Sequence, residues 1–314
     1  MALKDVTEKV LEAHADVFAD IVNVLLFNGE RKVDPKDLIA VDTVSTYKYA
    51  DSLKSQERDV VKIWKDHELS IGTIGMENQT APEKGYPLRI ISYDGAAYRQ
   101  QLNEIRKAQE ENIKRRKAGK PLIPVPKIRP VITLTLYFGE KEWNQPLSIH
   151  ESIEVGTELL PFVQDYSINL HKIAFLTDEQ VSMFQSDFRI VADFLVRKRR
   201  GEKDIQSTSK YAYDKIRHVE EMLNFLSQLT NDTRYREIYS SMSKADKEEA
   251  SMCTVLDYYI DKGEKQGLEK GLLSLVGYMK KQGRTISSVI DEIRLEPDYD
   301  IFSDDDIIAI YENE

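Results

Sequence analysis

The sequence contains a single cysteine, Cys253, so no disulfide can form within the chain and the composition is typical of a reducing compartment. It has no apolar run of 18 residues, and the segment after Met1 lacks the apolar core of a signal peptide. These absences predict a cytoplasmic protein that does not span a membrane. The histidines have no zinc-ligand spacing, and there is no glycine-rich phosphate loop or dinucleotide fingerprint.

The chain does contain enough apolar material for a large core. Of its 314 residues, 41% are hydrophobic and 9% are aromatic, which argues against global disorder. A chain of this length is expected to form two domains, or one domain with an appendage.

Charge is distributed unevenly along the chain. The formal net charge is −10, yet residues 106–129 hold nine basic residues and two acidic ones. A second basic run covers residues 197–200, and residues 291–314 hold ten acids and one arginine. A basic run can follow nucleic-acid phosphates, but it can also be a solvated helix face. The runs alone leave both alternatives open.

Hydrophobic periodicity predicts a helix followed by a β-hairpin. Apolar residues spaced by three and four predict a helix from Val6 to Phe27, ended by Asn28-Gly29, and a polar connector follows over 32–40. Two strands, 59–64 and 69–76, joined by a four-residue turn, are expected to form an antiparallel hairpin.

The next segments predict a crossover back to the same sheet. A helix is expected from Tyr86 to about Glu111, then an extended proline-rich linker at 121–130 and a buried strand at 131–138. Strand, helix and strand in this order imply a right-handed parallel crossover. The first 140 residues therefore predict a small α/β unit with a mixed sheet.

The remainder of the chain is predicted to be mainly helical. The expected helical segments are 159–162, 179–199, 211–229 and 247–261. Glycines at every fourth position, Gly263, Gly267 and Gly271, suggest a flexible or oligomerising helix, and Ser303 is a predicted N-cap before three aspartates. The patterns divide the chain into residues 1–140, 141–261 and 262–314.

Three polar residues are predicted to meet at one end of the hairpin. Asp59 opens the first strand and Glu77 follows the second, so an antiparallel pairing makes them neighbours. Gln79 shares the face of Glu77 because side chains alternate along a strand. Two close carboxylates favour a shared Mg²⁺ ion, which can activate water for attack on a phosphate. Ordinary polar loop boundaries would give the same pattern.

Longer segments around these residues resemble a known family. The stretches 57–61, 74–80 and 86–94, with the E-N-Q-T block of residues 77–80, are similar to the Rpn-like recombination-promoting nucleases, also labelled transposases, of the PD-(D/E)XK nuclease superfamily. The resemblance implies a restriction-endonuclease-like core of helix, mixed sheet, crossover helix and strand over residues 1–140. It covers the helical remainder only loosely.

The resemblance also implies roles for individual residues. Asp59 takes the position of the first acid, Glu77 that of the second, and Gln79 the position usually held by lysine. A glutamine cannot supply the positive charge of lysine, and Lys62 or Lys84 are the alternatives considered for it. Asp20 on the first helix is a possible additional acid, although it can equally be a helix-packing residue.

The leading hypothesis is a DNA endonuclease that uses Mg²⁺ or Mn²⁺. Asp59 and Glu77 would hold the metal, Gln79 would orient the attacking water, and the basic stretch would contact DNA phosphates through Lys114, Arg115, Arg116 and Lys117. The alternatives are a catalytically inactive DNA-binding or regulatory protein with the same fold, and an interaction scaffold that forms homo-oligomers through its C-terminal helices.

Overall fold

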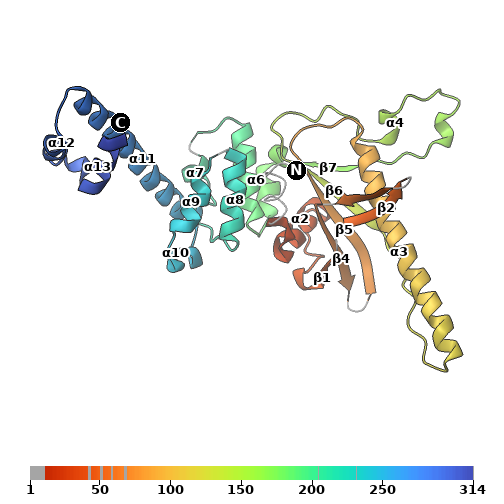
Figure 1. Ribbon diagram of the computed structural model, residues 1–314. Coiled ribbons are helices and arrows are strands. Elements are labelled where there is room, and N and C mark those ends of the chain that lie inside the picture. The colour runs from red at the N-terminus through yellow and green to blue at the C-terminus, as the bar shows by residue number, and fades with distance from the viewer. Residues whose placement is uncertain are drawn as a thin grey trace.

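The computed structural model describes residues 11–313, except residues 42–43, 50–51, 58, 67–68, 204 and 231. An α/β unit contains a five-stranded mixed sheet, and a mainly helical region follows it towards the C-terminus (Figure 1). The sheet has the strand order β1-β4-β5-β6-β7, made of β1 (Leu38–Ala40), β4 (Val60–Asp66), β5 (Leu69–Gln79), β6 (Val131–Tyr137) and β7 (Asn169–Lys172). A separate two-stranded sheet pairs β2 (Val44–Tyr49) with β3 (Ser52–Glu57).

The predicted hairpin is confirmed. Strands β4 and β5 pair antiparallel, with Val60 opposite Met76, although turn residues 67 and 68 lie outside the described residues. Strand β5 runs three residues beyond the predicted Met76, to Gln79. Strand β6 lies parallel to β5, as the predicted crossover requires. Strands β1 and β7, in segments predicted as connector and helical region, extend the sheet at its two edges.

Two helices cover opposite faces of the sheet. Helix α2 (Ala15–Phe27) ends where Asn28 adopts a left-handed φ of 50°, as the Asn-Gly pair predicted; the predicted start, at residues 6–10, lies outside the described residues. The Lys62 ammonium lies 5.5 Å from the centre of the Phe18 ring of α2. Helix α3 (Tyr86–Lys117) extends well past its predicted end at Glu111. It lies on the other face of the sheet, where the Thr133 hydroxyl donates a hydrogen bond to Asp94 (2.6 Å).

The helical region differs from the prediction because two buried aspartates interrupt helices. The segment 179–199 is two helices, since Asp20 accepts hydrogen bonds from Gln185 N and Ser186 N (2.7 Å each) between them. The segment 211–229 is helical only from Val219, because Asp187 accepts from the backbone N–H of Arg217 and His218. These carboxylates accept hydrogen bonds from backbone N–H groups, which in a continuous helix would donate to carbonyls of the same helix.

The helices of this region are mostly short, and one is long. They are α4 (Ile149–Ser152), α5 (Asp178–Met183), α6 (Phe188–Arg199), α7 (Ile205–Thr208), α8 (Val219–Thr230), α9 (Arg234–Ser241), α10 (Lys244–Glu248), α11 (Met252–Lys281), α12 (Ile286–Ile293) and α13 (Asp304–Asn313). Four 3₁₀ turns occur among the described residues: η1 (Pro35–Asp37), η2 (Leu160–Phe162), η3 (Ile173–Phe175) and η4 (Pro297–Tyr299). Ser303 caps α13 as predicted, because its hydroxyl accepts from Asp306 N (3.2 Å).

Two large hydrophobic clusters stabilise the described part of the chain, and a small third one consists of Tyr86, Ile90 and Ile168. The larger cluster runs from Leu11 to Val255 and joins the sheet to the helical region. For example, the Phe138 ring, directly after β6, packs against the rings of Phe188 and Phe225, with ring centres 6.3 and 6.0 Å apart. The smaller cluster joins the end of α11 to α12 and α13. The larger cluster therefore includes residues on both sides of the predicted division at 140.

Among the described residues, no helix combines the length and the apolar character that crossing a bilayer requires.

The glycine-spaced segment lies within the continuous helix α11. A Cβ atom at Gly271 would lie 2.8 Å from the Tyr299 hydroxyl, so this glycine permits close packing of η4 on α11. Gly267 faces open space. Oligomerisation through these helices stays a prediction.

Candidate functional site

Asp59 and Glu77 lie opposite each other at one end of the hairpin. Val60 pairs with Met76, so extending the register by one residue sets Asp59, which directly precedes β4, across from Glu77 and on the same face. Asp59 Oδ2 accepts a hydrogen bond from Asn78 N (2.7 Å), which fixes this carboxylate at the end of β5. Glu77 is buried, with 1% of its surface exposed. The structure thus brings together the two acids that the sequence predicted as neighbours.

A third acid, Glu12, reaches the same end of the strand from the α2 face. Its carboxylate accepts a hydrogen bond from the Asn78 side-chain amide (2.9 Å), and both residues are buried. Asn78 therefore contacts Asp59 through its backbone and Glu12 through its side chain. The sequence did not indicate Glu12, because its periodicity predicted one continuous helix from Val6 to Phe27, whereas the helix breaks at His14.

Gln79 contacts the loop that leads into α3. Its amide donates to Ala81 O (2.9 Å) and approaches Glu83 Oε2 (3.4 Å). Glu83 in turn accepts a hydrogen bond from Arg89 (2.7 Å). Gln79 is therefore linked to a guanidinium group through one carboxylate.

Arg89 supplies a positive charge beside Glu77. Its guanidinium lies 4.0 Å from Glu77 Oε2 and packs over the Tyr86 ring, with 4.8 Å from Cζ to the ring centre. Burial lowers the pKa of Arg89, but the surrounding groups, which include Glu83 and Glu77, outweigh it and raise that pKa. The site thus contains a permanent cation on the α3 face.

The charges of both predicted acids affect the pKa of Tyr86. Burial raises the pKa of its hydroxyl, the neighbouring Thr135 side chain acts in the opposite direction, and the negative charges of Glu77 and Asp59 raise the pKa further. Thr135 pairs with Glu77 across the parallel strands β5 and β6. Asp59, Glu77, Thr135, Tyr86 and Arg89 therefore form one polar cluster at this end of the sheet.

The donor set suits Mg²⁺ only in part. No three His, Cys, Asp or Glu side chains of the described residues are arranged as a complete metal-binding group. However, Mg²⁺ is commonly held by one or two carboxylates while waters and substrate phosphates complete its shell. Two opposed carboxylates, Asp59 and Glu77, meet that smaller requirement.

Asp20 and Lys62 are placed in other surroundings. The Asp20 carboxylate is buried and accepts from Gln185 N, Ser186 N and the Arg31 guanidinium, so its oxygens join α2 to the α5–α6 junction. The Lys62 ammonium donates to Ala13 O (2.7 Å), on the face opposite Glu77. The structure does not bring either residue to the Asp59–Glu77 end of the α3 face.

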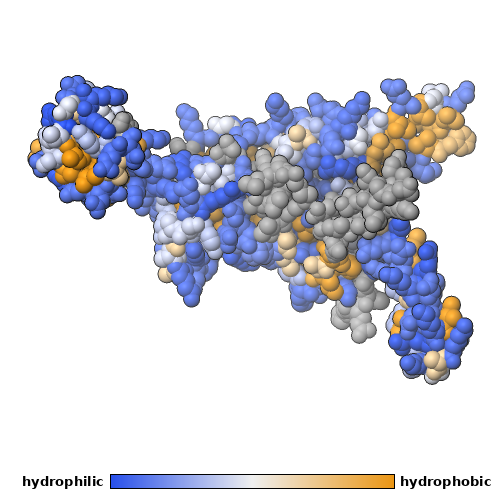
Figure 2. Space-filling view, in the orientation of Figure 1, coloured by the Kyte–Doolittle hydropathy of each residue, from blue (hydrophilic) through white to orange (hydrophobic). Residues whose placement is uncertain are grey.

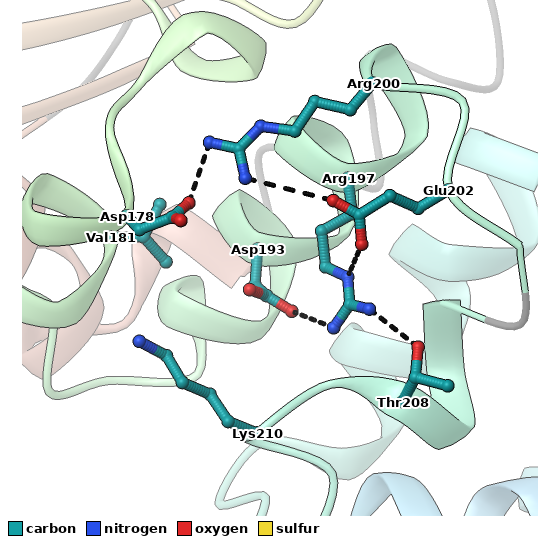
Figure 3. Close-up of a pocket in the computed structure, with 8 residues that line it drawn as sticks. All are labelled: Asp178, Val181, Asp193, Arg197, Arg200, Glu202, Thr208 and Lys210. Atoms are coloured by element: carbon teal, nitrogen blue, oxygen red, sulfur yellow. Dashed lines mark hydrogen bonds and ion pairs between the residues drawn. The ribbon is translucent and has the colours of Figure 1, made fainter.

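The basic run at residues 197–200 borders a cavity of about 300 Å³ (Figure 3). There Arg197 donates to Glu202 (2.8 Å) and Thr208 (2.6 Å), and Arg200 pairs with Asp178 (2.8 Å). Lys198 pairs with Glu140 (2.8 Å) outside the cavity lining. Acids within the protein therefore balance three of the four cations of this run, and the fourth, Arg199, donates to Ala174 O (2.7 Å), which indicates a structural role.

The predicted DNA-contacting residues occupy the far end of α3. Lys114, Arg116 and Lys117 are exposed there, whereas Arg115 pairs with Glu111 (3.0 Å) and donates to Pro121 O (3.2 Å). Since α3 begins at Tyr86 beside Glu77, one helix connects the carboxylates to the basic segment.

Comparisons with protein-family models, with curated proteins and with solved structures found no match to this chain. The site must therefore be interpreted from its own geometry.

Proposed function

We propose that this protein is a metal-dependent DNA endonuclease with the polar end of the hairpin as its active site. The observation that carries the proposal is the register of β4 and β5, which sets Asp59 opposite Glu77 with Arg89 on the same face. The helix, mixed sheet, crossover helix and parallel strand, together with the resemblance of residues 57–94, support a core of the PD-(D/E)XK type. The exposed basic end of α3 supports a polyanionic substrate.

In this proposal Asp59 and Glu77 hold Mg²⁺ or Mn²⁺, which when bound polarises a phosphate oxygen and lowers the pKa of a bound water. Asn78 positions Asp59 through its backbone N–H and Glu12 through its side chain. Gln79 orients a water with its amide oxygen, since its amide nitrogen already donates a hydrogen bond to Ala81 O. Arg89 stabilises the negative charge that develops on the phosphate.

The Arg89 role predicts a graded effect of substitution. Arg89→Gln removes the cation and should lower the cleavage rate by about 10²- to 10³-fold, whereas Arg89→Lys should retain an intermediate rate because it keeps the charge. Rates on supercoiled plasmid at saturating DNA would measure this. Arg99→Gln, an exposed arginine of the same helix, is the matched control. Equal rates for Arg89→Gln and Arg99→Gln would remove Arg89 from the mechanism.

One observation favours a second candidate, a DNA-binding protein without turnover. The Gln79 amide is engaged with the loop and contributes no charge, unlike the lysine expected at this position. Such a protein would bind DNA with an affinity that falls steeply with salt, and it would not cleave under any divalent ion.

A nuclease assay separates the two candidates. We expect the purified full chain to nick plasmid DNA with Mg²⁺ or Mn²⁺ and to be inactive with chelator. A Glu77→Ala protein purified in parallel controls for contaminating nucleases. Cleavage that survives both chelation and Glu77→Ala, or no cleavage with any metal, would refute the proposed hydrolysis.

A further inference from the structure

The distal part of α3 and the segment that returns from it form a rigid projection, defined here as residues 101–129 and named the α3 arm. Figures 1 and 2 show it standing away from the sheet at the lower right. Two side-chain amides fasten the returning segment to the helix. Gln101 exchanges hydrogen bonds with the backbone of Arg129 (2.8 and 3.2 Å), and Asn112 does the same with Ile123 (2.8 Å each). The arm is therefore held in place along its length.

The α3 arm carries positive charge that the described part of the chain does not neutralise. Arg115 and Arg129 are paired, with Glu111 and Glu104 respectively. In contrast, no described acid lies within ion-pair distance of the exposed Lys107, Lys114 or Lys117. The run at 197–200 shows the opposite arrangement, because acids pair with three of its four cations. Unbalanced cations on a chain of net charge −10 favour an external polyanion.

Helical geometry aligns part of this charge with the candidate active site. Lys107 follows Arg89 by about five helical turns and Lys114 by about seven, so the three side chains lie along one face. At about 1.5 Å per residue, Lys114 is about 37 Å from Arg89 along the axis. One turn of B-DNA is about 34–36 Å. Arg116, about 7.5 turns after Arg89, lies on the opposite face.

We infer that the row Arg89, Lys107 and Lys114, with Lys117 about a fifth of a turn to one side of it, holds the phosphate backbone of a DNA duplex for about one helical turn to one side of the cleavage site. The identity of the polyanion rests on the proposed function. A straight α-helix that lies along a duplex meets the same phosphate strand again after one turn of the DNA. The distance from Arg89 to Lys114 along the α-helix is close to that repeat. Neutral residues, Gln100 and Asn103, lie between its two charged ends. Three acids flank the row: Glu110 is exposed, whereas Glu104 and Glu111 pair with Arg129 and Arg115.

The test is the dependence of affinity on duplex length. Fluorescence anisotropy of the full chain would be measured with Ca²⁺ in place of Mg²⁺, on duplexes from about 12 to about 30 base pairs at several salt concentrations. The arm variant is Lys107→Gln/Lys114→Gln/Lys117→Gln. The control variant is Lys265→Gln/Lys270→Gln/Lys281→Gln, which removes the same charge from exposed positions of α11. It also corrects for the larger number of binding positions that a longer duplex offers.

We expect the wild type and the α11 variant to bind the long duplex at least about tenfold more tightly than the short one. The arm variant should lose most of this gain, and its slope of log Kd against log salt should fall by about two units. Equal affinity and slope for the arm and α11 variants on the long duplex would overturn the inference, as would the same gain on single-stranded DNA. Binding needs no cleavage, so a protein that shows the length dependence without nicking keeps the arm assignment and loses the hydrolytic one.

Discussion

Glu77→Gln is expected to lower metal-dependent plasmid cleavage by at least about a thousandfold, and Asp59→Asn should have an effect of similar size. Each substitution keeps the side-chain shape and removes one of the two negative charges proposed to hold the metal. A metal ion contributes several kcal/mol of charge stabilisation in the transition state, and the loss of about 4 kcal/mol corresponds to a factor of about 10³. Initial rates with Mg²⁺ and Mn²⁺ would measure the loss.

Stability distinguishes a catalytic effect from a folding effect. Glu77 is 1% exposed, and an amide is less costly to bury than a carboxylate, so Glu77→Gln should unfold at the same temperature as the wild type or higher. Asp305→Asn removes one exposed charge far along the chain and should leave both rate and melting temperature unchanged. A stable Glu77→Gln protein with more than about a tenth of the wild-type rate would contradict the assignment.

Asp20→Ala is expected to reduce the free energy of unfolding by about 3 kcal/mol, because it removes one partner of a buried, hydrogen-bonded charge pair. Asp20 is 4% exposed and accepts from two backbone amides and the Arg31 guanidinium. Without it these donors lose their acceptor, and the junction between α5 and α6 loses its attachment to α2. Urea unfolding followed by circular dichroism would give the change.

The comparison for this prediction is Asp178→Ala. Asp178 pairs with Arg200 but its side chain is 68% exposed, so solvent screens the pair and its loss should cost less than about 1 kcal/mol. Folded Asp20→Ala protein should retain cleavage, because the Asp20 oxygens are used within the fold. Full stability combined with lost cleavage would instead indicate the additional metal-side acid that the sequence suggested.

The elements that could be predicted from sequence are those with a clear local sequence pattern. The hairpin, the helix after it and strand β6 follow from alternation and periodicity within a few residues. The helix breaks at 184–187 and 211–218 could not be predicted, because the carboxylates that cause them, Asp20 and Asp187, come from distant segments. The short edge strands β1 and β7 give too few residues for a pattern.

The same distinction applies to the candidate site. Asp59 and Glu77 could be predicted because hairpin register alone makes them neighbours. Glu12 and Arg89 reach the site only through the packing of α2 and α3 on the two faces of the sheet. The sequence therefore predicted that Asp59 and Glu77 are neighbours, but not that Arg89 is the cation beside them. The cations proposed from the sequence were Lys62 and Lys84.

The continuous cluster from Leu11 to Val255 limits how this protein can be shortened or recombined. A fragment that stops at residue 140 would expose the Phe138 ring to water, because its partners Phe188 and Phe225 come from the helical region. The smaller cluster of α12, α13 and the end of α11 has its own interior. Gene fusions and deletions should therefore be tolerated in the last fifty or so residues far better than at the end of the sheet, and the proposed catalytic half cannot be transplanted without the helices that follow it.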